Sequence, residues 1–277
     1  MRTLPFTQVN VFSSAPLAGN PLAVVHDAGS LTDAQMAALA NWTNLSETTF
    51  LLPPANANAD YRVRIFTPAR ELPFAGHPTL GSCHAWLEAG GKPRNQDRVV
   101  QECGAGLVRV KRGATRLAFA APKLLRTGPL DADVLAKIAK ALRITPQDIL
   151  HHQWADNGPG WCAILLGSAR QVLALEPDYA ALAPLNLGVV GPHEQGYDAQ
   201  FEVRALIGSG GYEDPVTGSL NASLAQWLIG AGLAKPSYVA AQGACLKRDG
   251  RVYLEKDGED VWVGGDVVSV VRGKIEL

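Results

Sequence analysis

The sequence has few cysteines, and they do not cluster. Cys83, Cys103, Cys162 and Cys245 stand far apart and include no Cys-x-x-Cys pair. This spacing argues against a zinc site or a dithiol redox motif. It is also unlike the dense cysteine framework that holds small secreted domains together.

The sequence also lacks long apolar runs and runs of one charge. No stretch approaches the roughly 20 apolar residues of a membrane-spanning helix, and the N-terminal segment MRTLPFTQVNVF alternates without a signal-peptide core. We therefore expect a cytoplasmic protein with no membrane partner. The formal net charge is −1 and no basic run is present, so nucleic acid is not an expected partner. A small molecule is the expected ligand.

The chain does contain enough apolar residues to fold into a compact protein. Hydrophobic residues make up 47% of its 277 residues and charged residues 18%, which is typical of globular proteins. This length predicts two domains of roughly 120 to 150 residues. Residues 121–129 contain two prolines and little periodicity, so we interpret them as the linker. The predicted domains are residues 1–120 and 121–269, and a last strand at 270–277 is expected to complete the first domain.

Hydrophobic periodicity predicts mostly strands with a few helices. Helices are expected at about 31–44, where Trp42 belongs to the apolar positions, after His77, from Asp131 and after Asp214. The scattered tryptophans are interpreted as core residues. Alternating or short apolar segments predict strands at residues 6–12, 61–66, 161–168, 170–176, 201–206 and 245–248.

One motif occurs in both halves. Residues 76–87 read GHPTLGSCHAWL and residues 213–228 read EDPVTGSLNASLAQWL, and both contain [His/Asp]-Pro-x-x-Gly-Ser-x-x-Ala followed by Trp-Leu. Because proline is favoured in a first helical turn, each copy predicts a helix start with His77 or Asp214 at its mouth. The free N–H groups of such a start favour a bound anion, for example a carboxylate. The repeat predicts one site built between two halves.

The ionisable residues near these helix starts allow more than one interpretation. Glu47 precedes an apolar strand, so it is either a partly buried group suited to proton transfer or a solvated strand end. His77 and Asp214 either contact a substrate or cap their helices. Ser82 and Ser219 are predicted in the first helical turns, where their hydroxyls bind either a carboxylate or their own backbone.

Two other kinds of chemistry are disfavoured. Ser219, His77 and Asp214 are the residue types of a hydrolase triad, but no Gly-x-Ser-x-Gly motif surrounds Ser219. His151 and His152 are adjacent with no further ligand at metal-site spacing, which favours an ordinary loop over a metal site.

Five segments together resemble the PhzF family, the phenazine-biosynthesis-type isomerases. They are VNVFSSAPLAGNPLAVV, NLSETTFLLP, RVRIFTPARELPFAGHPTLGS, QECGAGLV and EDPVTGS, in this order across both halves. The resemblance implies an α+β fold like that of diaminopimelate epimerase. In such a fold two pseudo-symmetric domains each wrap a curved sheet or barrel around a central helix, and the active site lies in the cleft between them. The resemblance also implies a homodimer that needs no cofactor.

The resemblance also assigns roles to individual residues. Glu47, in the Ser-Glu-Thr-Thr-Phe motif, shuttles a proton, while His77 and Asp214 assist. The resemblance implies that Gly76, Gly218 and Ser219 bind the substrate, and that Gly218 and Ser219 hold the substrate carboxylate.

In the related epimerases two cysteines transfer the proton. By alignment, Ala75 and Thr217 occupy those positions here, which disfavours thiol-based racemisation.

The sequence thus leads to one main hypothesis and one alternative. The main hypothesis is a cofactor-independent isomerase, similar to dihydro-hydroxyanthranilate isomerase. It moves a proton and a double bond within a small, cyclic carboxylic or amino acid, with a glutamate as the general acid and base. The alternative is a protein that binds a small molecule in the same cleft without turnover.

Overall fold

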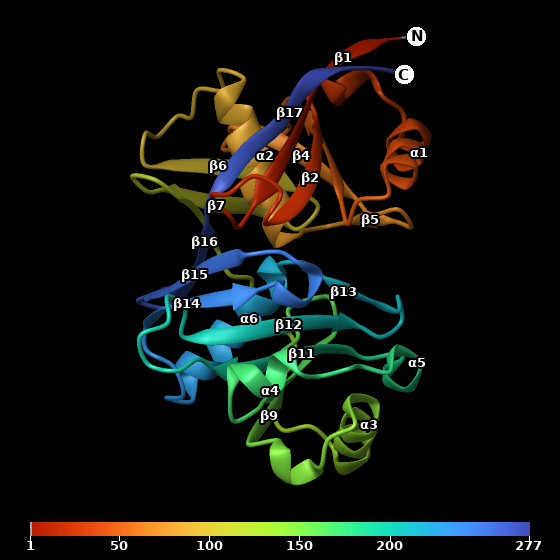
Figure 1. The fold of residues 1–277 in the computed structure, drawn as a ribbon. Helices are drawn as coiled ribbons and strands as arrows, with labels where there is room; N and C mark the ends of the chain where they lie inside the picture. Colours follow the sequence, from red (N-terminus) through yellow and green to blue (C-terminus); the bar gives the residue numbers. More distant parts are fainter. Residues whose placement is uncertain (1) are drawn as a thin grey trace. The chain divides into compact units, whose positions relative to one another are not determined.

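The computed structural model describes residues 2–277, which form two compact units. Unit 1 comprises the described residues up to Ala120 together with Gly264–Leu277, and unit 2 comprises Ala121–Val263. In each unit, strands surround one largely buried helix (Figure 1). This helix is α2 (Gly76–Glu88) in unit 1 and α6 (Gly218–Gly230) in unit 2. No helix among the described residues has the length and apolar character needed to cross a membrane.

Unit 1 contains one sheet in which the last strand of the chain pairs with the first. Its strand order is β17-β1-β2-β3-β4-β6-β7-β8, where β2/β3 and β4/β6 are parallel pairs and the others antiparallel. Figure 1 shows β17 running beside β1. The strands are β1 (Thr3–Val11), β2 (Asn20–Val25), β3 (Thr48–Leu52), β4 (Tyr61–Phe66), β5 (Glu71–Leu72), β6 (Arg98–Cys103), β7 (Gly106–Arg112), β8 (Leu117–Ala120) and β17 (Val267–Glu276).

Helix α1 (Asp33–Thr43) covers a small apolar cluster at one side of this sheet. Thr32 and Gln35 form a capping box at its start, because each side chain bonds the backbone N–H of the other. Met36 packs in the cluster with strand residues such as Phe50. The prediction that Trp42 is a core residue is wrong, since Trp42 is 82% exposed. The helical spacing of apolar residues identifies the apolar face of a helix. It does not show whether the sheet extends far enough to cover every residue on that face, such as Trp42.

Helix α2 packs closely against the sheet of unit 1. It contacts β1, β2, β3, β6, β8 and β17, and Gly81 lies where the approach is tightest. A Cβ atom at Gly81 would lie 2.6 Å from Leu22 Cδ2 and 2.9 Å from Val9 Cγ2. A glycine in mid-helix normally weakens the helix, so its presence here is explained by the space that the sheet leaves.

Unit 2 repeats the strand order of unit 1. Its order β9-β10-β11-β12-β14-β15 has parallel pairs at β10/β11 and β12/β14, as β1-β2-β3-β4-β6-β7 has at β2/β3 and β4/β6. β16 leads from unit 2 into the C-terminal segment of unit 1. The strands are β9 (His151–Trp154), β10 (Trp161–Leu165), β11 (Asn186–Pro192), β12 (Phe201–Ile207), β13 (Tyr212–Asp214), β14 (Ser237–Gln242), β15 (Gly250–Asp257) and β16 (Asp260–Gly265).

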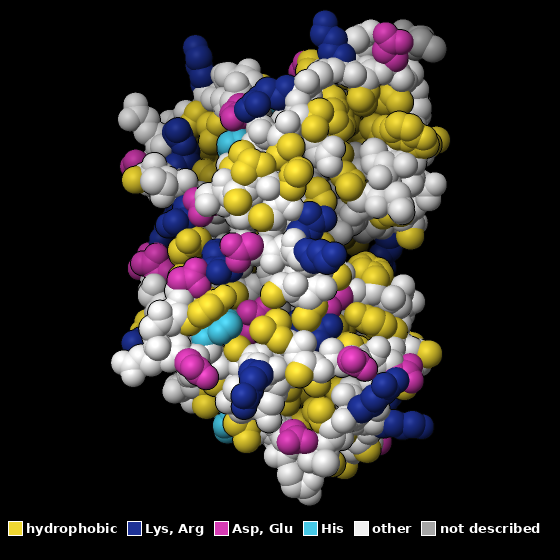
Figure 2. Space-filling model, in the orientation of Figure 1, with side chains coloured by type: hydrophobic (Ala, Val, Ile, Leu, Met, Phe, Trp, Pro, Cys, Tyr) yellow, Lys and Arg dark blue, Asp and Glu magenta, His cyan; other side chains and the backbone are white. Residues whose placement is uncertain are grey.

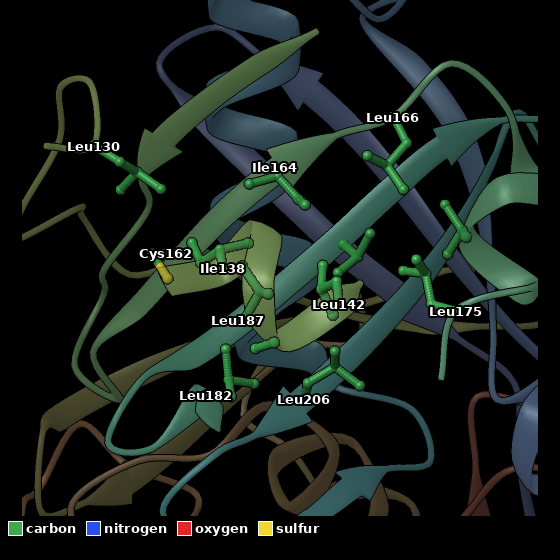
Figure 3. Packing of buried hydrophobic residues seen from close by; sticks show 13 residues of the cluster. Leu130, Ile138, Leu142, Cys162, Ile164, Leu166, Leu175, Leu182, Leu187 and Leu206 are labelled. Atoms are coloured by element: carbon green, nitrogen blue, oxygen red, sulfur yellow. The ribbon is translucent and has the colours of Figure 1, made fainter. Parts of the chain in front are cut away.

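Three helices of unit 2 pack against strands in a hydrophobic core. Figure 3 shows side chains from α3 (Ala132–Leu142) meeting those from β10, β11 and β12. α4 (Ala169–Leu173) and α5 (Tyr179–Leu182) add Val172 and Leu182 to this core.

Three local predictions for unit 2 are wrong. The apolar segment 170–176 lies mostly in helix α4 instead of a strand, and Ala244–Leu246 is a 3-10 turn where a strand was predicted. His151 and His152 lie in strand β9 instead of a loop. Neighbouring residues of a strand point to opposite faces, so these two rings cannot share one metal ion. His152 Nδ1 instead accepts the backbone N–H of Leu130 at 3.0 Å.

Matching hydrogen bonds show which residues of the two central helices occupy equivalent positions. In unit 1, Gln101 of β6 donates to the Thr79 hydroxyl, which donates to the carbonyl of the residue before α2. In unit 2, Asn221 donates both to Gln242 of β14 and to the carbonyl of the residue before α6. Thr79 and Asn221 are each the fourth residue of their helix. His77 therefore occupies the same helical position as Ser219.

This register corrects the one that the repeated motif predicts. The motif aligns His77 with Asp214, but α2 begins one residue before His77 and α6 begins four residues after Asp214. Ser82 is consequently not in a first turn. It is buried within α2 and donates to Thr49 Oγ1 at 2.9 Å. Ser219 is in the first turn of α6, as predicted.

A buried Glu–His pair crosses the β11–β12 hairpin of unit 2. His193 Nε2 lies 3.0 Å from Glu202 Oε2, and both side chains are buried. Burial raises the pKa of Glu202 to about 7, and it lowers the pKa of His193. A protonated Glu202 that donates to a neutral His193 is consistent with both pKa shifts. The other charged groups that act on Glu202 are Arg251, Glu213, Arg204 and Asp249.

We expect Glu202 to make the protein less stable as the pH rises. Its folded pKa lies above its ordinary 4.5, so the folded state holds a proton that the unfolded state has lost. This stabilisation is complete below pH 4.5 and is lost as the pH rises through about 7. In Glu202→Gln the neutral amide still donates to His193 but does not titrate. Between pH 5 and 8 the free energy of unfolding should therefore fall less in this variant than in the wild type, by up to about 3 kcal/mol. Urea unfolding across this range measures the difference, and parallel pH profiles for the two proteins would contradict it.

We expect Gly81→Ala to destabilise unit 1. The added methyl group overlaps Leu22 and Val9, and overpacking of this kind costs about 1–3 kcal/mol. Gly230→Ala is the matched control, because it also replaces a helical glycine but has open space around its Cβ position. Thermal unfolding should show a lower midpoint for Gly81→Ala and an unchanged or higher one for Gly230→Ala. Equal midpoints for the two variants would exclude close helix–sheet packing as the reason for Gly81.

Candidate active site

Two of the predicted site residues meet in unit 1. Glu47 directly precedes β3, and His77 is the second residue of α2. His77 Nε2 lies 3.4 Å from Glu47 Oε2, and the two side chains are 5% and 15% exposed. The structure thus brings a carboxylate and an imidazole together in a nearly dry environment, so Glu47 is not a solvated strand end.

Burial determines the protonation state of His77. It lowers the pKa of His77 to about 3, against the opposite effect of a hydrogen bond to the backbone of Pro21. A proline backbone offers only a carbonyl, so the ring donates its one N–H there. Nε2 makes no hydrogen bond within the described residues and is the nitrogen that faces Glu47. His77 therefore presents a neutral lone pair to the carboxylate at neutral pH.

Hydroxyl groups hold the two elements that carry this pair. Ser82 of α2 donates to Thr49 of β3, and Thr49 donates to the Ala23 carbonyl. Thr48 bonds Thr43 at the end of α1 at 2.9 Å. These bonds join α2 to the start of β3, and β3 to β2 and to the end of α1, so the elements that carry Glu47 and His77 are held together.

The other predicted residues lie at the start of α6 in unit 2. Asp214 ends β13, and its Oδ2 accepts the hydroxyl proton of Thr217. The Gln242 amide donates to the Asp214 carbonyl at 3.1 Å and to Thr217 Oγ1 at 3.0 Å. Asp214 is therefore held by the residue that precedes the helix.

The interpretation of His77 and Asp214 as helix caps is wrong. The N-cap positions are Ala75 and Thr217, and neither makes a side-chain capping bond in the described chain. The first-turn N–H groups that follow at Gly76 and Gly218 thus have no side-chain cap, which is the condition that favours an anion.

Two residues that the sequence did not single out hold Ser219. Trp161 Nε1 donates to Ser219 Oγ at 3.1 Å, and Asn157 Nδ2 donates to the Ser219 carbonyl at 3.0 Å. The only sequence signal is that Asn157 lies in a Gly- and Pro-rich loop. An indole N–H cannot act as a base, so the contact at the Ser219 hydroxyl gives no support to a hydrolase triad.

The described residues contain no group of three His, Cys, Asp or Glu side chains arranged to hold a metal ion. Glu47 and His77 belong to unit 1, whereas Asp214, Gly218 and Ser219 belong to unit 2. The common cleft that the sequence analysis predicts, and the homodimer, stay predictions.

Residues 9–273 match the PhzC-PhzF family, which is described as phenazine biosynthesis-like protein. The chain belongs to this family. It is 37% identical to antisense-enhancing sequence 1 of Schizosaccharomyces pombe, over 97% of each chain. It is 33% identical to the trans-2,3-dihydro-3-hydroxyanthranilate isomerase of Pseudomonas chlororaphis, over 97% of this chain and 98% of the relative.

Solved structures bear out the PhzF-type, diaminopimelate epimerase-like fold. The PhzF family protein of Bacillus anthracis superposes with a TM-score of 0.86 at 21% identity and covers the whole of both chains. More distantly, a hydroxyproline epimerase of Agrobacterium vitis matches with a TM-score of 0.56 at 15% identity, over 99% of this chain and 92% of the epimerase. At these identities the likeness concerns the fold alone.

We expect His77 to make the protein less stable in acid. Its folded pKa of about 3 lies below the ordinary 6.5, so the unfolded state binds a proton that the folded state does not. Stability is therefore lost as the pH falls below 6.5, by at most about 1.4 kcal/mol per pH unit. His77→Gln removes the titrating group and should give a shallower decline between pH 6.5 and 4. Unfolding free energies in urea measure both slopes, and identical slopes would mean that the His77 ring titrates in the ordinary range.

Proposed function

We propose that this protein is an isomerase that moves a proton, and with it a double bond, within a small carboxylic acid. The observation that carries the proposal is the contact between Glu47 and a buried, neutral His77. A carboxylate is a suitable general acid and base when a sheltered site fixes its position. Relatives at 33–34% identity that are named isomerases support the same reaction class.

Glu47 is the residue that carries the proton in this proposal. In its ionised form it takes a proton from one carbon of the substrate, and the C–H electron pair shifts the double bond. The protonated carboxyl then returns the proton to a different carbon, so the product is an isomer and no electrons are gained or lost. The neutral His77 does not bring to ionised Glu47 the positive charge that an imidazolium would bring. Its Nε2 also offers an acceptor to the protonated carboxyl.

The residues at the start of α6 are proposed to bind the substrate in the same reaction. The N–H groups after Thr217 and the hydroxyl of Ser219 suit a carboxylate. Asp214, which is fixed by Thr217, is proposed to assist the charge changes of the reaction. At the start of α2, Gly76 is proposed to supply the corresponding N–H group in unit 1.

The proposed substrate class is a small cyclic carboxylic or amino acid. The relative from Pseudomonas chlororaphis is named for the isomerisation of trans-2,3-dihydro-3-hydroxyanthranilate. We therefore propose this compound as the first substrate to test. Ala75 and Thr217 in place of thiols support a carboxylate-based reaction over a thiol-based one.

We expect Glu47→Gln to lower turnover of this compound by about 10²- to 10⁴-fold. Glutamine keeps the size of the side chain but cannot accept the proton. Glu88→Gln, in the partly exposed last turn of α2, is the matched control and should keep full activity. Product formation is followed by the change in ultraviolet absorbance. Near wild-type turnover in Glu47→Gln would disprove the role of Glu47.

The same assay in deuterium oxide separates an isomerase from a protein that only binds. Return of the proton through Glu47 predicts solvent deuterium at a carbon of the product, detected by mass spectrometry or NMR. Saturable binding of the compound with no deuterium in it and no product would favour the binding protein.

A further inference from the structure

A buried glutamine of β14 bonds four groups around the start of α6. Gln242 is 1% exposed. Its Oε1 accepts the backbone N–H of Thr217 at 3.0 Å and an N–H of Asn221 Nδ2 at 2.8 Å. Its Nε2 donates to the Asp214 carbonyl at 3.1 Å and to Thr217 Oγ1 at 3.0 Å. Both N–H groups and both lone pairs of this amide are therefore in use.

These partners allow only one orientation of the Gln242 amide. A backbone N–H can only donate, and a backbone carbonyl can only accept. The N–H of Thr217 therefore identifies the amide oxygen, and the Asp214 carbonyl identifies the amide nitrogen. The second N–H of Nε2 then lies on Thr217 Oγ1. It occupies an acceptor position of the hydroxyl, so the hydroxyl proton points away from Gln242.

The hydroxyl proton of Thr217 is directed at Asp214 instead. Asp214 Oδ2 accepts it, and Thr217 is 7% exposed, so little water competes for this bond. A hydrogen bond donated to a carboxylate favours its ionised form. The bonds from Gln242 through Thr217 to Asp214 therefore run in one direction and end on a titratable group.

The equivalent bonds of unit 1 end on the backbone. Gln101 of β6 also donates to a hydroxyl of the central helix, that of Thr79, at 3.1 Å. The Thr79 hydroxyl then donates to the Ala75 carbonyl at 2.9 Å. A backbone carbonyl does not titrate, so these bonds only hold the helix. In unit 2 a glutamine of the corresponding strand acts on a side chain that the reaction is proposed to use.

We propose that Gln242 is a positioning residue for the reaction, which acts through the Thr217 hydroxyl on the carboxylate of Asp214. The inference rests on the proposed function, in which Asp214 assists the charge changes of the substrate. At 1% exposure Gln242 itself does not contact a substrate. Thr217 supplies the hydrogen bond that favours ionised Asp214, and Gln242 determines that the hydroxyl proton points toward the carboxylate.

Titration of the Asp214 carboxyl measures this interaction without a substrate. The full chain, isotope-labelled at its aspartate carboxyl carbons, is titrated by NMR, and the resonance missing from Asp214→Asn belongs to Asp214. The other charged side chains on β12, on β13 and in residues 243–249 after β14 are Glu202, Arg204, Glu213, Lys247, Arg248 and Asp249. These groups are the same in all compared variants, so a difference in the titration midpoint reports the hydrogen bond.

Variants of Thr217 test the hydrogen bond itself. Thr217→Val keeps the shape of the side chain but removes the hydroxyl, so the Asp214 midpoint should rise by about one pH unit. Thr217→Ser keeps the hydroxyl and should retain the wild-type midpoint.

Variants of Gln242 test whether it acts through that hydroxyl. Gln242→Leu should also raise the Asp214 midpoint, because the hydroxyl proton is no longer directed at the carboxylate. In a Thr217→Val background the same change should add no further shift. Gln101→Leu removes the equivalent bond of unit 1 and is the matched control, with an unchanged Asp214 midpoint. Circular dichroism checks the fold of each variant, and Gln242→Met, which keeps the length of the side chain, replaces Gln242→Leu if the latter does not fold.

Turnover of trans-2,3-dihydro-3-hydroxyanthranilate gives the second measurement. Thr217→Val and Gln242→Leu should lower kcat about tenfold, the loss of one hydrogen bond, and leave KM nearly unchanged. The acid side of the pH profile of kcat should move upward with the Asp214 midpoint.

The outcomes that overturn the proposal differ from a failure of the proposed function. Equal Asp214 midpoints in the wild type and Thr217→Val would overturn it, as would a further shift when Gln242→Leu is added to Thr217→Val. Shifted midpoints with an unchanged kcat and pH profile would remove Gln242 from the reaction. Full turnover by Glu47→Gln would disprove the proton transfer, and no turnover by the wild type would exclude this substrate. Both of those results leave the titration results unchanged.

Discussion

The desolvation of His77 is the constraint on which the proposed chemistry depends. A histidine in water would be partly protonated near neutral pH and would pair with Glu47 as an ion. Burial in the first turn of α2 prevents this and keeps the ring neutral. α2 also packs closely against the sheet of unit 1, and Gly81 lies at a tight point of that contact. The helix that carries the buried His77 is therefore closely packed against the sheet of unit 1.

The two units use one architecture for different chemistry. Their strand orders match, and buried polar bonds from Gln101 and Gln242 place the two central helices in the same register. In this register His77 and Ser219 are equivalent. The position that presents an imidazole lone pair in unit 1 presents a hydroxyl donor in unit 2. The duplicated scaffold thus places an imidazole at one helix start and a hydroxyl at the other.

The structure contains a second buried Glu–His pair, and the comparison is informative. His193 and Glu202 lie closer together, at 3.0 Å, and share a hairpin of unit 2. Their side chains are 9% and 3% exposed, so a proton shared between them satisfies two groups that have little access to solvent. Glu47 keeps 15% of its side chain exposed and directly precedes β3. The carboxylate of Glu47 is thus less completely buried than that of Glu202, which is 3% exposed.

The sequence alone identified the family motifs, the PhzF-type fold, and Glu47, His77, Asp214 and Ser219 as candidates, because these depend on residue type and order. It misplaced the helix starts, since identical Pro-x-x-Gly-Ser segments begin a helix at different residues in the two units. Hydrogen bonds from strands far along the chain, at Gln101 and Gln242, decide where each helix begins. Only the tertiary structure moved Ser82 into the core, exposed Trp42 and brought Asn157 and Trp161 to Ser219. The periodic pattern of apolar residues contains no information on contacts between residues that are distant in the sequence.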